Sequence, residues 1–423
     1  MVKKRYVLSV SYSDYRNSIG GTDKVICAHS EMFNRAGIGY VFIFPLNFFH
    51  NYPIKNNPYW GIVEDGEYRG AFHTEGVISY LQSLQENNGM CLSCVHVHHL
   101  KNVNIKKLGV ILNTVSCDVY FYVHDYYNIC VSTNLLRSDN HLFCHGKLDR
   151  EQCGDCKFYP TSEKHSSRFL ALLSNLKTDY YFVCPSGAAK EQFSVGYPQF
   201  SDKALVIYHQ KFLGSFDGNK NPHTPLRVAF IGSQLSHKGW GQFLQIVEKH
   251  SGSGKYDFYY FGKKAVDNDS IKHISVEFKG NLNAMSDALR EQEIDCAVLW
   301  STWPETYAYT YYEALSANCF IVTNKNSGNI QYQTRNRNNG VVLDSDNELL
   351  ELFDDSRLLE KMISDYKKQN HCLPLNLLEN DDVLNTSEKQ SLINCGNNRA
   401  ENLFKKQMDR LVNGIYRWRS ENK

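Results

Sequence analysis

The sequence predicts an α/β fold arranged in two domains. Three observations support this prediction. The chain has 423 residues, which is long enough for two domains of ordinary size, and its 42% hydrophobic content is sufficient for real cores. Short apolar runs alternate with amphipathic segments along most of the chain, as in βα units. A polar stretch at 214–225, rich in Gly, Asn and Pro, separates two halves with this same alternation.

Composition narrows the functional classes. A formal net charge of +1 gives no reason to expect a nucleic-acid partner. No run approaches the ~20 apolar residues of a membrane span. The apolar run after the basic start is too short for a signal peptide, and thirteen cysteines without a secretion signal indicate a reducing compartment. We therefore expect a cytoplasmic enzyme, and peripheral contact with the inner face of a membrane stays open.

The first half begins with a strand at 6–10, which leads through a polar loop to Gly20 and Gly21 and then to a helix at 24–36. Glycine lets the backbone approach an anion closely, so this turn suits phosphate, although a tight βα turn explains it equally well. Further strands are predicted at 40–45, 94–99, 118–126, 180–186 and 204–209, and further helices at 167–176 and 187–193.

The second half repeats the pattern. A strand at 226–231 is followed by Gly232, a short loop, Lys238-Gly239 and an amphipathic helix at 240–249. We predict strands at 256–262, 278–280, 295–300, 319–323 and 339–344, and helices at 283–292, 307–317, 349–368 and 398–418. The polar stretch 380–397 is expected to be a flexible connection.

The stretch from Trp300 to Asn324 carries the strongest functional signal. A strand leads into a loop that holds Glu305, a helix carries Glu313, and a second strand closes a βαβ unit. Ligands bind at the carboxyl ends of strands in such sheets, and a helix N-terminus favours phosphate. The Glu313 carboxylate, further along the helix, can accept hydrogen bonds from a diol such as ribose.

The spacing of Glu305 and Glu313 in this setting resembles the paired-glutamate motif of retaining glycosyltransferases of the GT-B type, family four. The resemblance covers most of the chain and also includes Lys238-Gly239. Many members carry an arginine five residues before that lysine, where this chain has Ser233. A subgroup shares both His237 and the Pro-Glu-Thr-Tyr form of the second motif.

The resemblance implies a GT-B fold, with two doubly wound Rossmann-like domains and the active site in the cleft between them. It implies a first domain at 1–213, a linker at 214–225 and a second domain at 226–395. Residues 396–423 would form a terminal helix that crosses back to the first domain.

The resemblance also implies roles for individual residues. Lys238 would steady the leaving diphosphate, Glu305 would contact the donor sugar, and Glu313 would hold the ribose hydroxyls. His124, which follows an apolar strand, would line the sugar site as a catalytic residue. Asp125 and His98 would lie on the acceptor side. The remaining donor-binding residues would be Gly20, Gly21, Ser233, Thr306, Tyr307, Ala308 and Gly328. No catalytic metal is required, because lysine and helix dipoles stabilise the charge.

The implied activity is transfer of a sugar from a UDP-, GDP- or dTDP-linked donor to a glycan or lipid-linked acceptor, with bacterial O-antigen or capsule synthesis as the family-level expectation. Two alternatives stay open. One is another GT-B enzyme, such as a sugar-nucleotide epimerase or a phosphorylase, and the other is a non-catalytic scaffold of a glycan-assembly complex. The aromatic-rich loop at 47–68 is interpreted as packed irregular structure, or as a contact for an acceptor sugar, lipid carrier or membrane.

Four cysteines form a separate candidate site: Cys130, Cys144, Cys153 and Cys156. The last two have CxxC spacing, and soft thiolates suit tetrahedral zinc. Thirteen residues separate the first two, so the pattern is not a tight double CxxC repeat. We predict a small structural zinc loop within an insertion at about 130–156. His141 or His145 as a substitute ligand, a disulfide and free thiols stay open.

Overall fold

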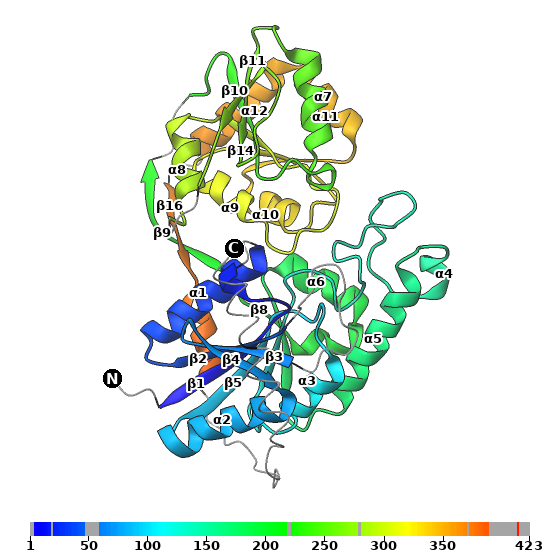
Figure 1. Cartoon of the computed structure of the whole chain (residues 1–423). Coiled ribbons are helices and arrows are strands. Elements are labelled where there is room, and N and C mark those ends of the chain that lie inside the picture. Colours follow the sequence, from blue (N-terminus) through cyan, green and yellow to red (C-terminus); the bar gives the residue numbers. More distant parts are fainter. Residues whose placement is uncertain are drawn as a thin grey trace.

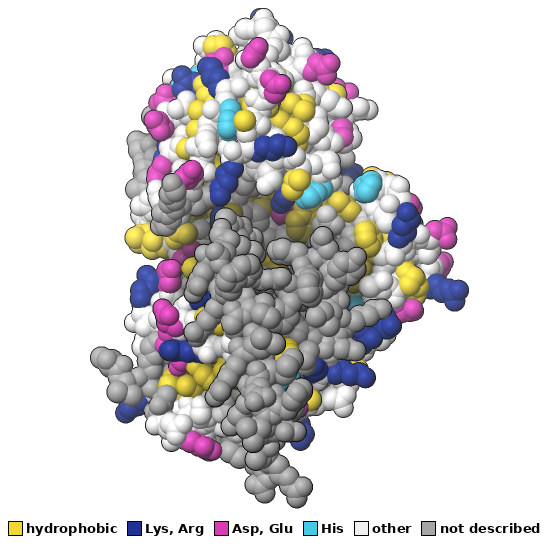
Figure 2. Space-filling model, viewed as in Figure 1, with side chains coloured by type: hydrophobic (Ala, Val, Ile, Leu, Met, Phe, Trp, Pro, Cys, Tyr) yellow, Lys and Arg dark blue, Asp and Glu magenta, His cyan; other side chains and the backbone are white. Residues whose placement is uncertain are grey.

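The computed structural model describes residues 4–17, 20–46, 59–217, 221–277, 281–369, 372–388 and 413. The chain forms two α/β domains stacked along one axis, with the first domain below and the second above in Figure 1. Each domain is built on a sheet with helices on both faces. Figure 2 shows the same two domains in space-filling form. The predicted α/β class is confirmed.

The first sheet has the order β4-β3-β2-β1-β5-β6-β7-β8. Six of its strands are parallel: β1 (Arg5–Val10), β2 (Gly39–Pro45), β5 (Cys91–Val97), β6 (Val119–Tyr122), β7 (Tyr180–Cys184) and β8 (Ala204–Val206). An antiparallel pair, β3 (Tyr59–Glu64) and β4 (Glu67–His73), extends one edge. The interpretation of 47–68 as irregular is therefore wrong from Tyr59 onward, and its first part, 47–58, lies outside the described residues.

Helices cover both faces of this sheet. On one face, α1 (Gly21–Arg35) buries residues such as Ile26 and Phe33 against β1 and β2. On the other face, α2 (Thr74–Asn88), α3 (Ile105–Leu112) and α5 (Tyr159–Ser174) pack over a second apolar cluster. The remaining helices are α4 (Arg150–Cys153), α6 (Gly187–Gly196), η1 (Tyr15–Asn17) and η2 (Pro198–Lys203).

The second sheet has the order β12-β11-β10-β13-β14-β15, and all its pairings are parallel. Its strands are β10 (Leu226–Ile231), β11 (Tyr256–Phe261), β12 (Ile271–Ile274), β13 (Cys296–Val298), β14 (Phe320–Asn324) and β15 (Gly340–Leu343). From β10 the chain adds β11 and β12 on one side, and it then returns to add β13, β14 and β15 on the other side. The strand order therefore reverses between β10 and β13. Ligand sites in open α/β sheets form at such a reversal, beyond the carboxyl ends of the strands.

The helices of the second domain also form two layers. On one face lie α7 (Trp240–His250), α11 (Asp346–Asp354) and α12 (Ser356–Gln369), and on the other lie α8 (Ala284–Glu291), α9 (Tyr309–Ser316) and α10 (Asn329–Arg337). The single helix predicted at 349–368 is therefore two helices, and the strand predicted at 278–280 lies outside the described residues. Across the described part of the chain, no helix is both long and apolar enough to cross a membrane.

Two strands join the domains. β9 (Gln210–Asp217) pairs antiparallel with β16 (Cys372–Glu379), so residues 214–217 of the predicted linker are part of a strand. The chain returns to the first domain through β16 and η4 (Asp381–Ser387), where the Thr386 hydroxyl lies 2.9 Å from Nε2 of His96. The flexible connection predicted from 380 is therefore wrong at least as far as 388. Of the predicted terminal helix, only Asn413 is described, and it accepts a 3.3 Å hydrogen bond from the hydroxyl of Tyr68 in β4.

Candidate active site

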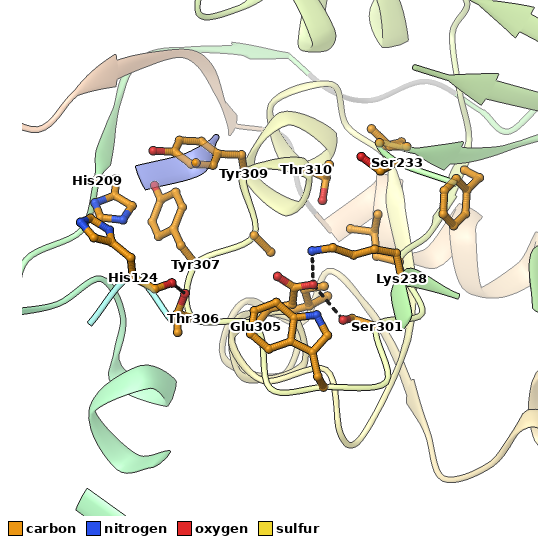
Figure 3. Close-up of a pocket in the computed structure, with 18 of the residues that line it drawn as sticks. His124, His209, Ser233, Lys238, Ser301, Glu305, Thr306, Tyr307, Tyr309 and Thr310 are labelled. Atoms are coloured by element: carbon orange, nitrogen blue, oxygen red, sulfur yellow. Dashed lines mark hydrogen bonds and ion pairs between the residues drawn. The ribbon is translucent and has the colours of Figure 1, made fainter. Parts of the chain in front are cut away.

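A cavity of about 400 Å³ lies between the two domains at the strand reversal of the second sheet (Figure 3). The first domain contributes the start of α1 and the residues that follow β6 and β8. The second domain contributes the loops after β10 and β13 and the start of α9. The residues that line it are Gly21, Thr22, His124, His209, Phe230, Ile231, Gly232, Ser233, Lys238, Val298, Leu299, Ser301, Trp303, Glu305, Thr306, Tyr307, Ala308, Tyr309, Thr310 and Ile330.

An ion pair between Lys238 and Glu305 forms the polar centre of this cavity. The Ser301 hydroxyl donates a 2.8 Å hydrogen bond to Oε1 of Glu305, the oxygen that also binds the lysine (Figure 3). The Glu305 side chain is only 6% exposed, whereas that of Lys238 is 34% exposed. The negative charge of the buried Glu305 carboxylate is therefore balanced by Lys238, while the Lys238 ammonium keeps an exposed side on which an anion can bind.

The glycine after Lys238 explains how the lysine reaches this position. Gly239 has φ +85°, and a Cβ there would lie 2.4 Å from the carbonyl oxygen of Trp300. The lysine turn, η3 (Ser236–Lys238), therefore packs directly on the segment that follows β13. The backbone N–H of Thr302 also donates to the His237 carbonyl, at 3.0 Å. These contacts bring the two motifs predicted from the sequence together.

The loop that follows Glu305 is bound to the first domain. The Thr306 hydroxyl donates to the backbone carbonyl of His124 at 2.7 Å, and the Ser186 hydroxyl donates to the Thr306 carbonyl at 2.6 Å. The backbone N–H of Gln210 donates to the Tyr307 hydroxyl at 3.1 Å. Ala308, at φ +62°, then begins α9. The first N–H groups of a helix have no partner within it, so this end of α9 is suited to a phosphate.

Gly328 has a different position from the one expected at the donor. It does not line the cavity, and a Cβ on it would lie 2.4 Å from both the backbone nitrogen of Glu305 and the carbonyl carbon of Pro304. The next residue, Asn329, donates its backbone N–H to the Glu305 carbonyl at 2.8 Å. Gly328 thus allows α10 to pack against the Glu305 loop, and the prediction of a direct approach to the donor is not supported by this geometry.

We expect Gly328→Ala to destabilise the fold by about 3 kcal/mol or more, because it combines a backbone clash with φ +61°. Gly254→Ala is the matched control, since Gly254 has φ +71° and a Cβ on it would meet nothing within 4 Å. Chemical denaturation of both variants measures the difference. Equal destabilisation of the two would mean that the contact with Glu305 contributes nothing.

Glu313 lies in α9 and does not line the cavity. Its side chain is buried, and burial raises the pKa of its carboxyl to about 7, a rise that the nearby Lys24 opposes. The carboxyl therefore changes charge near neutral pH. The neighbouring residues Tyr309 and Thr310 do line the cavity, which places Glu313 one helical turn deeper than the open surface.

The histidines of the first domain occupy two layers. His124 lines the cavity, and its Nε2 lies 2.9 Å from Nδ1 of His98. His98 is completely buried, so the prediction that it contacts an acceptor directly is wrong, and its contact with the site runs through His124. Burial lowers the pKa of His124 well below its ordinary 6.5, and the nearby His209 lowers it further. At neutral pH His124 is therefore an uncharged imidazole.

Asp125 does not line the cavity either. Its Oδ2 lies 3.1 Å from Nε2 of His99, and its Oδ1 accepts a 2.8 Å hydrogen bond from the backbone N–H of Tyr127. Behind His98 lie His29 and His96, and the ligand atoms of these three imidazoles lie within 4.8 Å of one another. Burial lowers the pKa of each of the three, so this group is neutral and forms a polar layer between the sheet and α1.

The two glycines of the predicted pair, Gly20 and Gly21, have different roles. Gly21 lines the cavity, and a Cβ on it would meet nothing within 4 Å, so it leaves space for a ligand. Gly20 precedes α1, and its N–H donates to Oδ2 of Asp23 at 3.0 Å. Ser233, at the position where the resemblance would place an arginine, also lines the cavity. Lys238 is the one Lys or Arg among the described residues that line it.

Three further lining residues, His209, Tyr309 and Trp303, were not predicted from the sequence. The ring centroids of His209 and Tyr307 lie 4.8 Å apart, and Tyr309 stacks on His209 at 6.0 Å. The indole N–H of Trp303 is buried with no partner, and its ring lies 5.2 Å from Nζ of Lys238. His209 follows the apolar run at 204–206, as His124 follows β6, so the same reasoning could have identified it.

The four cysteines lie together in the insertion, and all are free thiols. Electrostatic interaction with Cys130, Cys153 and Cys156 raises the pKa of the Cys144 thiol, after the larger effect of burial. Among the described residues, however, no three of these sulfur atoms lie within 4.8 Å of one another. The thiols are therefore neighbours without forming the compact ligand set of a zinc site, and zinc binding stays a prediction.

We predict that the purified chain binds one zinc ion through these thiols, because four neighbouring thiols supply the donor set that tetrahedral zinc prefers. Elemental analysis should find about one zinc per chain, and Cys153→Ser/Cys156→Ser should abolish it and lower the thermal midpoint. Cys27→Ser, which removes an exposed thiol of α1, is the control. Undiminished zinc in the double variant would contradict the prediction.

No protein-family model matches the chain, and a comparison with curated proteins found no match. Among solved structures, TarM is similar with a TM-score of 0.53 at 10% identity, over 86% of this chain and 94% of TarM. Sucrose-phosphate synthase from Thermosynechococcus elongatus has a TM-score of 0.51 at 11% identity, over 87% of this chain and 95% of its own. A glycosyltransferase from Rickettsia africae ESF-5 has a TM-score of 0.51 at 13% identity, over 98% of this chain and 99% of its own.

The similarity concerns the fold, because identity is low throughout. The neighbours share a two-domain Rossmann-like architecture, and this chain has two doubly wound sheets with a cavity between them. The predicted GT-B fold is therefore confirmed.

Proposed function

We propose that the chain is a retaining glycosyltransferase that transfers a sugar from a nucleotide-sugar donor to a glycan or lipid-linked acceptor. The observation that supports this most is the interdomain cavity. It joins the Lys238–Glu305 pair, the N-terminus of α9, the open surface at Gly21 and the imidazole of His124 in one space. Synthesis of a bacterial surface polysaccharide is the corresponding biological role.

In this proposal the second domain binds the donor. The ammonium of Lys238 and the first N–H groups of α9 bind the diphosphate, which leaves as the sugar is transferred. Glu305 orients the sugar, and Glu313 accepts hydrogen bonds from the ribose once its carboxyl is ionised. The indole N–H of Trp303 offers one more donor at the same place. The contacts with Glu305 and Ser301 hold the ammonium and the carboxylate in position, and charges held in position can stabilise a leaving group.

The reaction breaks the bond between the anomeric carbon and the diphosphate oxygen and forms a bond from the acceptor oxygen to the same carbon. The acceptor's proton passes to the leaving diphosphate, so no separate oxidant, reductant or metal enters the balance. Among the lining residues, Glu305 is the one carboxylate, and it is already bound to Lys238 and Ser301. Attack by the acceptor on the face that the diphosphate leaves therefore accounts for retention.

Calorimetric titration with UDP-, GDP- and dTDP-sugars tests the donor site directly. We expect one nucleotide class to bind and Gly21→Val to weaken it at least ~10-fold, because the added side chain enters the cavity. Gly241→Val is the matched control, since Gly241 also lies in the first turn of a helix with nothing within 4 Å and lines no part of this cavity. A folded protein that binds none of these donors would overturn the proposal.

The same preparation separates the proposal from its alternatives. A transferase consumes donor fastest with an acceptor and keeps the anomeric configuration of the donor in the product, which NMR of the product reads directly. Rapid epimerisation of donor without acceptor, phosphorolysis, or inversion at the anomeric carbon would each contradict it. Binding of donor with no turnover under any acceptor would identify a scaffold.

A further inference from the structure

The imidazole of His124 offers a ligand one accessible ring nitrogen. Its Nε2 faces into the first domain, where it lies 2.9 Å from Nδ1 of the buried His98. Its Nδ1 has no hydrogen-bond partner in the described part of the chain, yet it is not one of the buried side-chain atoms. Since His124 lines the interdomain cavity, Nδ1 opens onto this cavity. What the first domain presents to a ligand here therefore depends on which nitrogen of His124 carries the proton.

The 2.9 Å contact between the two rings allows two arrangements. A neutral imidazole has one N–H donor and one acceptor nitrogen, and a single proton lies between the two rings. If His98 donates, the proton of His124 is on Nδ1 and points to the cavity. If His124 donates, its Nδ1 is a bare acceptor, and His98 must carry its own proton on Nε2. The surroundings of Nε2 of His98 decide between the two, because a histidine tautomer follows from its hydrogen-bond network.

Nε2 of His98 is buried and has no hydrogen-bond partner among the described residues. The His98 ring stacks on Tyr122 at a centroid distance of 4.3 Å, and the ring of His29 lies 5.3 Å away. A buried N–H without a partner is costly, and unpaired N–H groups are rarer in folded proteins than unpaired acceptors. The arrangement in which Nε2 of His98 is the bare nitrogen is therefore the more stable one. His98 then carries its proton on Nδ1 and donates it to His124.

The neighbouring side chains do not pair with Nε2 of His98. The Thr386 hydroxyl donates its own proton to a backbone carbonyl at 2.7 Å, so it accepts from Nε2 of His96 at 2.9 Å. Nδ1 of His96 is then an acceptor, and the Tyr122 hydroxyl lies 3.4 Å from it. His29 has a buried Nδ1 that is also without a partner. Each of these groups is thus either bonded elsewhere or unpaired, and His124 is the one hydrogen-bond partner of the His98 ring among the described residues.

From this geometry we infer that His98 is a positioning residue, which donates from Nδ1 to Nε2 of His124 and thereby fixes Nδ1–H of His124 as a hydrogen-bond donor toward the cavity. For its part in the reaction the inference rests on the proposed function, and it specifies what the first domain can bind there. The ligand group at His124 must offer an acceptor oxygen, such as that of a hydroxyl or a carboxylate.

A fixed N–H also excludes His124 as the base that takes the acceptor's proton, because its accessible nitrogen has no free lone pair. This agrees with passage of that proton to the leaving diphosphate. Figure 3 shows His124 and Lys238 on opposite sides of the cavity, so both domains present hydrogen-bond donors to an oxygen-rich ligand.

NMR of the full chain with isotope-labelled histidine tests the assignment without any ligand. The chemical shifts of the ring nitrogens and of Cδ2 differ between the two neutral tautomers, and His124→Gln identifies the signals of His124 by their loss. At neutral pH the wild type should carry the proton on Nδ1 in both His124 and His98. A proton on Nε2 of His124, or a mixture of its two tautomers, would overturn the inference.

Two variants of His98 separate positioning from a structural role. His98→Leu removes the donor, so the proton of His124 should exchange between its two nitrogens and the shifts should move toward their average. His98→Asn keeps an N–H at about the reach of Nδ1, so His124 should keep the wild-type shifts. Equal His124 shifts in the two variants would mean that His98 is purely structural. His165→Leu is the control, since it removes another buried histidine of the first domain that lines no part of the cavity.

Steady-state donor consumption connects the tautomer with the reaction. The value of kcat/KM should fall about 5-fold or more in His98→Leu, the effect of one lost hydrogen bond, and should recover in His98→Asn. An equal fall in both variants would contradict the positioning role. Because the NMR measurement uses the ligand-free chain, its result is valid whether or not a nucleotide sugar binds. Failure of the inference and failure of the proposed function are therefore distinguishable.

Discussion

Replacing Lys238 by methionine is expected to lower donor turnover by about 10²–10³-fold, the effect of removing one preorganised charge from a leaving group. The same change leaves the buried carboxylate of Glu305 without its ionic partner, with only the Ser301 hydroxyl still bound to it. An unpaired buried charge costs about 3–5 kcal/mol, so the variant should also unfold at lower temperature. Steady-state donor consumption and thermal unfolding measure the two effects.

The double variant Lys238→Met/Glu305→Gln separates them. Neutralising both partners removes the unpaired charge, so the thermal midpoint should recover while turnover stays low. Lys263→Met, at an exposed lysine of the same domain that lines no part of the cavity, should leave both quantities unchanged. Recovery of turnover in the double variant would show that Lys238 acts on stability alone and would exclude the role proposed for it at the diphosphate.

Glu313→Gln is expected to stabilise the fold at pH 8 and to weaken donor binding. The folded carboxyl has a pKa of about 7 against an ordinary value of 4.5, so between these values the folded state binds more protons than the unfolded state. Stability therefore falls as pH rises through this window, and the full penalty applies above pH 7. The amide avoids this penalty, and its gain should be on the order of 1–3 kcal/mol at pH 8, vanishing near pH 4.5.

Donor affinity should rise over the same pH range in which the stability of the fold falls. In the wild type it should increase as pH rises through about 7, because the ionised carboxyl accepts hydrogen bonds that the acid form accepts less well. Glu313→Gln should bind donor about 10-fold less tightly at pH 8 and lose this pH dependence. Glu291→Gln, an exposed glutamate of α8, is the control. A pH-independent wild-type affinity would exclude Glu313 from the ribose site.

Much of the fold could be predicted because its parallel strands are short apolar runs bounded by polar loops. Lys238 and Glu305 were predictable for a related reason. Both follow strands beside the reversal of the second sheet, and residues after such strands converge at one edge. His124, Ser233 and Gly21 could be placed in the cavity by the same reasoning.

The predictions that were wrong concern residues whose structure depends on contacts with segments distant in the sequence. Residues 380–388 are polar and were predicted to be part of a flexible connection, yet 381–387 form a 3-10 helix that is bonded to the first domain through Thr386. The role of Gly328 depends on a contact with the backbone of Glu305, and no sequence pattern reports a contact between separate loops. His98 follows a strand as His124 does, but its neighbours bury it completely.

The hydrogen bonds of Thr306 have a consequence for how the two domains move. Its hydroxyl and its carbonyl are both bound to the first domain, while the residues on either side, Glu305 and Tyr307, belong to the second domain and line the interdomain cavity. A hinge motion that separates the domains must therefore break both bonds or pull this loop away from α9. Thr306 thus links the two domains mechanically, and the shape of the cavity depends on how far the hinge is open. For the proposed transferase, opening of the hinge would release the product and closing would assemble the site, so both would be parts of one movement.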